Sequence, residues 1–306
     1  MIQIFLIFWL ATAALIILDE EIVRLIIHLG IFSMVSAVCF FLLAAPDVAM
    51  AEAVVSVFST IIFIVCFEKY YSLAALTESE DVKKKIIIRL LKGLFVVGLA
   101  ILFFMFIPDV PANTFLKDQY IAMFAKDVGG ENAITAIYLG YRVYDTIFEA
   151  LMLLVSVAAI IHLSWHQGNA KTMARIESGI LNYNIVDATV RIVVPMLMMF
   201  SFYLIVNGHI AAGGGFQGGV LIAVLFICRY IIQHIHDLNV DRIIIIEKLI
   251  FVLIAVVAVY FIFLGAGNML SLPRGLYLVL MNLLVGVKVA CGLLVMFYRF
   301  IVYESI

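Results

Sequence analysis

The 306-residue sequence has little charge: 13% of its residues are Asp, Glu, Lys or Arg, while 66% are hydrophobic. Soluble domains are about 45–50% apolar and about 25% charged, so this chain has too few charges to cover a water-exposed surface. A soluble enzyme and a disordered chain are therefore excluded. The net charge of −2 also leaves no basic surface for DNA or RNA, which excludes a nucleic-acid binder.

Motifs of catalysis and metal binding are missing as well. The sequence has no HExxH, GxSxG or dinucleotide-binding fingerprint. Its four cysteines, Cys39, Cys66, Cys228 and Cys291, lie within or at the ends of apolar runs and have no CxxC or Cys/His spacing. We interpret them as small buried hydrophobes. We therefore expect no catalytic residue, no metal site and no cofactor in this chain.

Long apolar runs are what the sequence does contain. A helix needs about 20 such residues to cross the hydrocarbon core, whereas a membrane barrel shows alternating segments of about 10 residues. The runs are continuous, so we expect an all-α polytopic membrane protein. The opening MIQIFLIFWL has no basic start and no cleavage site, which predicts a span and not a removed signal peptide. About nine spans are predicted: Ile2–Leu18, Ile22–Ala45, Val48–Phe67, Ile86–Ile107, Val143–Leu163, Ala188–Val206, Gly214–Ile235, Ile243–Gly265 and Leu276–Phe300.

The placement of Lys and Arg predicts the orientation, because basic residues favour cytoplasmic loops. The segment after the third predicted span contains the run Lys83–Lys85 and is assigned to the cytoplasm. With nine spans, the N-terminus then lies outside and the C-terminus inside. Fourteen basic residues fall on the predicted cytoplasmic side and four on the outer side.

Two polar stretches, TESEDVKKK and SWHQGNAKTMARIESG, suggest a division into three blocks. Residues 1–75 hold three helices, residues 76–166 hold two spans with an outer segment, and residues 167–306 hold four spans. The outer segment from Pro108 to Tyr141 contains ITAIYLGY, which could form a short helix. Whether such a helix lies on the membrane or re-enters it stays open.

The first group of polar residues in the spans is PDVAMAEAVV. Asp47 follows Pro46 at the start of the third span, where a carboxylate favours the helix N-terminus; we prefer this structural role for it. Glu52 lies about 7.5 Å deeper and about 140° around the helix. A charge inside the bilayer is costly, by about 2.5–3.5 kcal/mol on insertion scales. Glu52 is therefore predicted to face a protein partner or a water-filled path.

The second group is YRVYDTIFEA. Arg142, Asp145 and Glu149 have the spacing i, i+3 and i+7, which places them on one helical face. Arg142 can pair with Asp145 at the membrane surface and so set the depth of the helix. Glu149 is then left deeper, at the start of a long apolar run, and is the better functional candidate of the three.

The third group is NGHIAAGGGFQGG, which has no charge and one histidine. Each glycine in a helix costs about 1 kcal/mol relative to alanine, so we expect irregular backbone here. Such backbone at membrane depth must be buried in protein or line a cavity. His209 could relay a proton or bind a neighbouring subunit, or it could simply cap a tight hairpin. The predicted structural loop contains Gly213, Gly214, Gly215, Gly218 and Gly219.

Lys288, in MNLLVGVKVACG, lies near the middle of the last predicted span. A lysine at that depth cannot easily reach the membrane surface, and a buried lysine usually has an acidic partner or a depressed pKa. We interpret it as part of an ion or proton path. His28, inside the second span, could contact Glu52, although the sequence does not show this.

These motifs together resemble a known family. HIAAGGGFQGG and NLLVGVKVACGLLVMF are similar to the B-type subunit of Mrp multisubunit Na⁺/H⁺ antiporters, whose usual motif is GHNAPGGGFxGG. PDVAMAEAVV resembles a small three-helix subunit that is also found near the end of the Mrp A subunit. NAITAIYLGYRVYDTIFEA resembles the segment that follows it, with Val143 and Phe148 at two usual glycine positions. The glycine motif matches at Gly208, His209, Gly213, Gly214, Gly215, Phe216, Gly218 and Gly219, and departs from it at Ile210 and Ala212.

The resemblance implies an ion-translocating membrane subunit in the cytoplasmic membrane of a prokaryote. The fusion of these pieces without the long antiporter subunit resembles complexes of the membrane-bound hydrogenase type. It implies Na⁺ and H⁺ as transported ions, other antiporter subunits as partners, and nickel–iron and iron–sulfur centres in a redox arm. Two alternatives stay open, namely a free-standing Mrp antiporter and a scaffold without its own ion path. The residues expected on the path are Asp47, Glu52, Arg142, Asp145, Glu149, His209 and Lys288.

Overall fold

The computed structural model describes residues 2–19, 21–70, 91, 93–95, 97–98, 101–102, 105, 115–163, 184–233, 239–264 and 274–301. Within these ranges all regular structure is helical, which confirms the predicted all-α fold. The helices are α1 (Ile2–Leu18), α2 (Ile22–Leu42), α3 (Pro46–Tyr70), α5 (Phe115–Asp127), α6 (Ala133–Ala136), the π-helix η2 (Ile137–Tyr141), α7 (Val143–Leu163), α8 (Asn184–Asn207), α9 (Gly215–Gln233), α10 (Val240–Leu264) and α11 (Arg274–Ile301).

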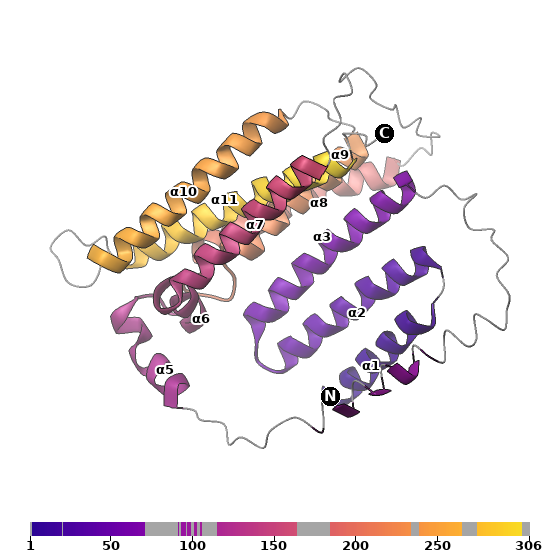
Figure 1. Cartoon of the computed structure of the whole chain (residues 1–306), viewed down its shortest axis with the longest axis horizontal. Helices are drawn as coiled ribbons and strands as arrows, with labels where there is room; N and C mark the ends of the chain where they lie inside the picture. The colour runs from indigo at the N-terminus through magenta and orange to yellow at the C-terminus, as the bar shows by residue number, and fades with distance from the viewer. Residues whose placement is uncertain are drawn as a thin grey trace.

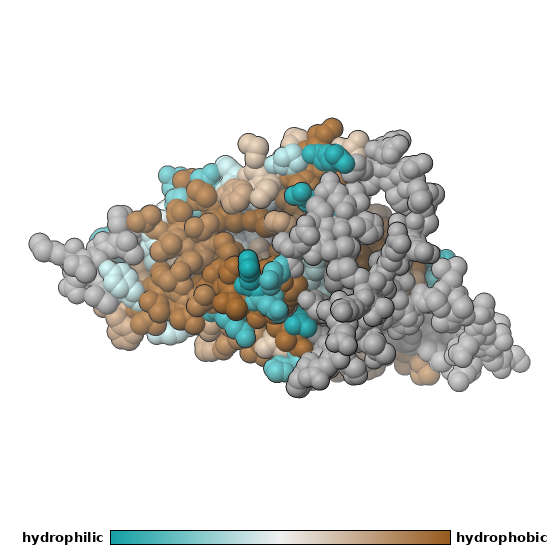
Figure 2. All heavy atoms as spheres, turned by 90° about the horizontal axis from the view of Figure 1, so that it is seen from above, coloured by the Kyte–Doolittle hydropathy of each residue, from teal (hydrophilic) through white to brown (hydrophobic). Residues whose placement is uncertain are grey.

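Six helices of the described part are long and apolar enough to cross a membrane, and α1 and α9 are shorter apolar helices. Thirteen of the 22 residues of the fourth predicted span, 86–107, lie outside the described residues, so the count of nine stays a prediction. Large apolar side chains such as Ile4, Met199 and Phe263 are 70 to 75% exposed. Brown, hydrophobic side chains cover much of the described surface in Figure 2. A bilayer is the environment that suits such a surface.

Helix α11 is the centre of the molecule. It packs against α7, α8, α9 and α10, and 67% of its most apolar 18-residue window is buried, against 11 to 28% in the other five candidate spans. Figure 1 shows α7, α8, α9 and α10 arranged around it. Polar side chains on α11 are therefore enclosed by protein and shielded from lipid.

Helices α1, α2 and α3 lie in sequence beside this bundle, and α3 makes the contact with α9 (Figure 1). The tight turn between α2 and α3 is a Schellman motif, in which Ala44 N–H bonds to Phe41 O and Ala45 N–H bonds to Phe40 O. Ala44 has a φ of 58°, a left-handed conformation that is unusual for a residue other than glycine. Pro46 then begins α3 and so fixes Asp47 in its first turn.

The outer segment folds into α5, α6 and η2 at one end of the bundle (Figure 1). The predicted short helix in ITAIYLGY is present as α6 and η2, whereas α5 was not expected. Ala136, Leu139 and Val143 are buried with Tyr277 and Met281 of α11. This end, where the glycine-rich loop between α8 and α9 also lies, is called the loop end below.

Candidate ion path

Lys288 of α11 forms an ion pair with Glu247 of α10. Each side chain is only 1% exposed, and Lys288 lies about 21 Å along α11 from its start, by helix rise. The Lys288 ammonium also lies 5.5 Å from the centre of the Phe251 ring, within the range of a cation–π contact. The second carboxylate oxygen of Glu247 has no hydrogen-bond partner among the described residues. The bundle therefore encloses a Lys–Glu pair whose hydrogen-bonding capacity is only partly satisfied.

Glu247 was missed by the sequence analysis. It lies in IIIIEKLIF beside Lys248, whose charge was assigned to the cytoplasmic surface. The structure separates the two neighbours, since Glu247 is buried and Lys248 is exposed. The available signal was the acidic residue itself, which directly follows the run of four isoleucines in α10, together with the need of Lys288 for an acidic partner.

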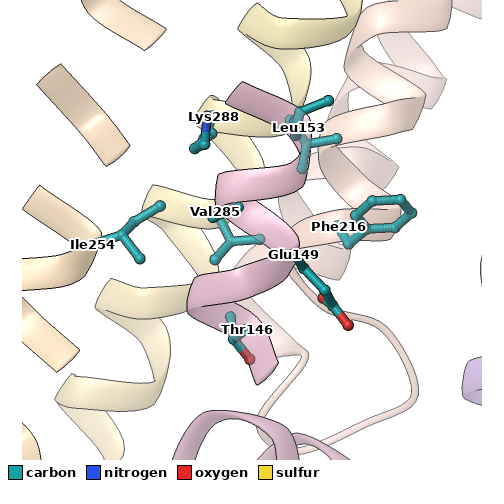
Figure 3. A pocket seen from close by; sticks show the side chains of 9 residues that line it. Thr146, Glu149, Leu153, Phe216, Ile254, Val285 and Lys288 are labelled. Carbon is teal, nitrogen blue, oxygen red and sulfur yellow. The ribbon is translucent and has the colours of Figure 1, made fainter. Parts of the chain in front are cut away.

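A small cavity separates α7 from α11 and joins Glu149 to Lys288. Its lining includes Thr146, Glu149 and Phe216 as well as Lys288. The space open to the centre of a water-sized sphere is about 30 Å³, and a water molecule needs about 10–15 Å³ by this measure. Figure 3 shows the Glu149 carboxylate at the Phe216 side of this site, pointing away from Lys288. Water in the cavity could thus connect two groups that do not touch.

Arg142 and Asp145 form the expected ion pair at the start of α7. Their side chains are 64% and 45% exposed, so the pair is largely open to its surroundings. Exposed pairs contribute little, about 0–1 kcal/mol. The pair fits the predicted role of setting the depth of the helix. It also engages Arg142, the cation that lies nearest to Glu149 in the sequence.

The glycine-rich loop ends α8 at Asn207 and starts α9 at Gly215. Gly213 and Gly214 have φ values of 148° and 154°, in a region that side chains rarely allow. At Gly215 an added Cβ would lie 2.2 Å from the backbone oxygen of Asn282. The irregular backbone predicted from the sequence is therefore limited to residues 208–214. The glycines at 215, 218 and 219 instead permit close packing of α9 within the bundle.

Asp47 and Asn132 bind this loop from two other elements. Asn132 caps α6 through its side-chain oxygen, while its Nδ2 lies 3.0 to 3.2 Å from Asp47 Oδ1, Gly208 O and Ala211 O. The Gly213 N–H donates to the same Asp47 oxygen at 3.1 Å. Asp47 thus does more than favour its own helix N-terminus, because it connects α3 to the loop end of the bundle. Asn132 was missed, although an Asn just before a helix is a recognisable N-cap.

Hydroxyl groups extend this polar junction toward α11. Thr135 donates to Gly208 O at 2.6 Å, and the Tyr138 hydroxyl donates to Asn282 Oδ1 at 3.2 Å. Asn282 Oδ1 also accepts the Gly215 N–H at 3.2 Å, while its buried Nδ2 has no partner among the described residues. Burial raises the pKa of Tyr138 to about 12, so this hydroxyl keeps its proton near neutral pH.

His209 contributes to the junction through its backbone. Its carbonyl accepts the N–H groups of Glu131 and Asn132 at 2.9 and 3.0 Å. Its ring Nδ1 lies 3.0 Å from Val206 O, which is the local capping contact that the sequence analysis considered. The half-buried ring lies at the loop end, away from the Lys288 pair.

Glu52 belongs neither to the junction around Asp47 nor to the Lys288–Glu247 pair. It is half-buried, and no hydrogen bond or ion pair connects it to another described residue. Val54 and Phe58 of the same helix pack against α9 and α11, and Glu52 lies about 200° around α3 from Val54. It therefore faces away from the bundle. His28, which could have contacted Glu52, pairs with Asp19 instead.

Two groups of polar residues thus result: a junction at the loop end around Asp47 and Asn132, and a deeper group of Glu149, the cavity and the Lys288–Glu247 pair. No group of three His, Cys, Asp or Glu residues that could hold a metal ion occurs in the described part of the chain. Fold and site together define a polytopic helical membrane protein that encloses a Lys–Glu ion pair within its spans.

Comparison with known families narrows this class. Residues 185–295 match a family model described as a domain related to the MnhB subunit of Na⁺/H⁺ antiporter. Residues 7–72 match a second family model, MbhD, which describes one of the subunits of MBH. The chain thus carries an Mrp-type module, as the sequence motifs suggested.

Individual relatives agree with this assignment. The chain is 32% identical over 128 residues to a protein of Staphylococcus saprophyticus named for antiporter subunit mnhA2, and 29% identical over 143 residues to its counterpart in Staphylococcus haemolyticus. These matches cover 42% and 47% of this chain but only 15% and 17% of the relatives. The chain therefore corresponds to a small part of these longer proteins.

Two solved structures share the fold. A chain of the Mrp complex from Dietzia sp. DQ12-45-1b matches with a TM-score of 0.77 and 16% identity, over 99% of this chain and 35% of its own length. A chain of the membrane-bound sulfane sulfur reductase, an archaeal respiratory membrane complex, matches with a TM-score of 0.57 and 20% identity. That match covers 72% of this chain and 99% of the other.

Proposed function

We propose that this chain is a membrane subunit of a multisubunit ion-translocating complex and forms part of its Na⁺/H⁺ antiport module. The Mrp-type module supports the general class. The buried Lys288–Glu247 pair carries the proposal for this chain, because ionised groups inside a membrane protein are expensive and mark ion or proton pathways.

The path consists of Glu149, the cavity and the Lys288–Glu247 pair. Glu149 lies about 9 Å from the start of α7, while Lys288 and Glu247 lie about 21 Å and 25 Å from the loop-end termini of α11 and α10. Glu149 and Lys288 line the same cavity, and Glu247 pairs with Lys288 on its other side. Each belongs to a different helix, so a small relative movement of these helices alters their spacing.

Lys288 acts as the mobile charge in this scheme. Lys288 lines the cavity, and its ammonium pairs with Glu247. When Glu247 accepts a proton, the pair loses its attraction, and the ammonium is drawn through the water-sized cavity toward the Glu149 carboxylate. A cation that reaches Glu149 has the opposite effect and drives Lys288 back to Glu247. Exchange of H⁺ against Na⁺ follows from this alternation.

The complex that the chain joins is of the membrane-bound hydrogenase type, in the cytoplasmic membrane of a prokaryote. The match of residues 7–72 to an MBH subunit supports this, while the relatives named for antiporter subunit mnhA2 keep a free-standing antiporter as the alternative. Partners are other membrane subunits of the antiport module and a hydrogenase-like redox arm, which supplies the nickel–iron and iron–sulfur centres. The N-terminus lies outside and the C-terminus in the cytoplasm.

The junction around Asp47 and Asn132 favours a second candidate, a scaffold that only holds neighbouring subunits in place. Replacing Glu149 by Gln in the whole complex separates the two functions. Sodium-dependent proton movement in inverted membrane vesicles should fall at least tenfold per assembled complex. The matched control is Glu131→Gln, which changes an exposed acid outside the spans and should keep full transport. Unchanged transport in the Glu149 variant would favour the scaffold.

A further inference from the structure

Helix α7 has an exposed polar face. Asp145, Glu149 and Ser156 lie within about 40° of one another around the helix, and both Glu149 and Ser156 are exposed. The buried residues Ala150 and Val157 lie about 80–140° around the helix from these positions, on the inner side. Helix α7 thus presents an exposed carboxylate within its span, at the edge of the cavity that Phe216 of α9 also lines.

Lipid is a poor cover for this face. Glu149 lies about 9 Å into the span, where an ionised side chain facing hydrocarbon costs about 2.5–3.5 kcal/mol or more. The cations of the described bundle that lie nearest are already engaged, since Arg142 pairs with Asp145 and Lys288 with Glu247. The Glu149 carboxylate also points away from Lys288 (Figure 3).

We propose that this face of α7 docks a transmembrane helix of a partner subunit, which brings a Lys, Arg or His side chain to Glu149. Charge complementarity identifies the partner, because a carboxylate at this depth is best neutralised by a cation from a neighbouring helix. The inference rests on the proposed function, in that it requires a multisubunit complex and places the subunit interface at Glu149.

A photo-crosslinking amino acid at position 156 tests this in the intact complex. The matched control is the same group at Val155, which is 57% exposed, lies at the same depth and points about 100° away. The crosslinked partner peptide is identified by mass spectrometry of the purified complex. We expect a transmembrane peptide with a basic residue from position 156, at a yield at least tenfold above that from Val155. Crosslinks to lipid alone, or to a peptide without a basic residue, would overturn the proposal.

Two charge changes then separate the docking from the transport role. Glu149→Gln should lower recovery of the crosslinked partner at least fivefold, and neutralising the mapped basic residue as well should restore it. If the partner docks as expected but the double variant transports normally, the docking proposal is supported and a role of Glu149 in the ion path is contradicted. If transport is lost in Glu149→Gln while position 156 crosslinks only to lipid, the role in the ion path is supported and the docking proposal is contradicted.

Discussion

Lys288 and Glu247 are buried in a bundle whose remaining core is mostly apolar. Removing the charge of one partner leaves the other charge buried and alone, which typically costs about 3–5 kcal/mol, whereas replacing both by apolar residues of similar volume is often neutral. The stability of the pair therefore depends on both members being present.

We predict that Lys288→Met lowers the unfolding free energy of the detergent-purified protein by about 3–5 kcal/mol. Adding Glu247→Leu should recover most of this loss, because no unpaired charge is then left. Thermal unfolding of the two variants and of the parent protein measures this loss and its recovery. A double variant no more stable than Lys288→Met would contradict a direct pairing.

At the scale of single residues, the sequence predicted Lys288 and Glu149 as members of the candidate site, but not the residue that pairs with Lys288. Glu247 and Lys288 are separated by 41 positions, and only the packing of α10 on α11 brings them together. Asn132 was missed for the same reason, since its three acceptors come from α3 and the glycine-rich loop. In contrast, Arg142 and Asp145 are three residues apart and their pairing followed from helical spacing.

Among the elements, α6 and the glycine-rich loop form the contact that joins α3 to the bundle. Asn132 takes part both as a helix cap and as a donor to Asp47, Gly208 and Ala211. Asn239, just before α10, also accepts a backbone N–H, from Arg242, but its side chain bonds to no other helix of the described part. Asn132 and Asn239 thus share the capping role, but only Asn132 also makes hydrogen bonds to distant parts of the chain.

We predict that Asn132→Ala destabilises the protein by about 1.5–5 kcal/mol, the sum of a lost cap at about 0.5–2 kcal/mol and of lost bonds to a carboxylate and buried carbonyls at about 1–3 kcal/mol. Asn239→Ala should lower the unfolding free energy only by the contribution of the cap, about 0.5–2 kcal/mol. Thermal unfolding compares the two variants, and equal losses would show that the contacts to α3 and the loop contribute nothing.

Gly215 lets α9 approach α11 closely. Because an added Cβ would lie 2.2 Å from Asn282 O, Gly215→Ala forces these helices apart, and overpacking of this kind costs about 1–3 kcal/mol. At Gly275 an added Cβ meets nothing within 4 Å, so Gly275→Ala should be neutral or slightly stabilising. Unfolding temperatures check this, and similar shifts for both variants would contradict the close approach.

Most elements could be predicted because an apolar run of about 20 residues identifies a membrane helix without knowledge of its neighbours. Helix α5 was missed because its 13 residues mix charged and apolar positions and none of them is buried. The extent of the irregular loop was overestimated, since composition does not distinguish a glycine that turns the chain from one, such as Gly215, that admits a neighbouring helix.

At the scale of the whole molecule, the basic residues predict one orientation in the membrane. The loop end, with Glu131 and His209, then faces outward. A cysteine introduced at Glu131 in a variant without the four native cysteines should react with a membrane-impermeant maleimide in intact cells. A cysteine at Asn239, at the other end of the bundle, should react only after the membrane is permeabilised. The reverse pattern would invert the orientation.

The central claim is that the Lys288–Glu247 pair lies on the ion path. The most direct measurement is sodium-dependent proton transport by the purified, reconstituted complex that carries both Glu247→Leu and Lys288→Met. We expect normal assembly, because no charge is left unpaired, and transport at least a hundredfold below that of the parent complex. Transport at the parental rate per assembled complex would contradict the claim and leave the pair with a structural role.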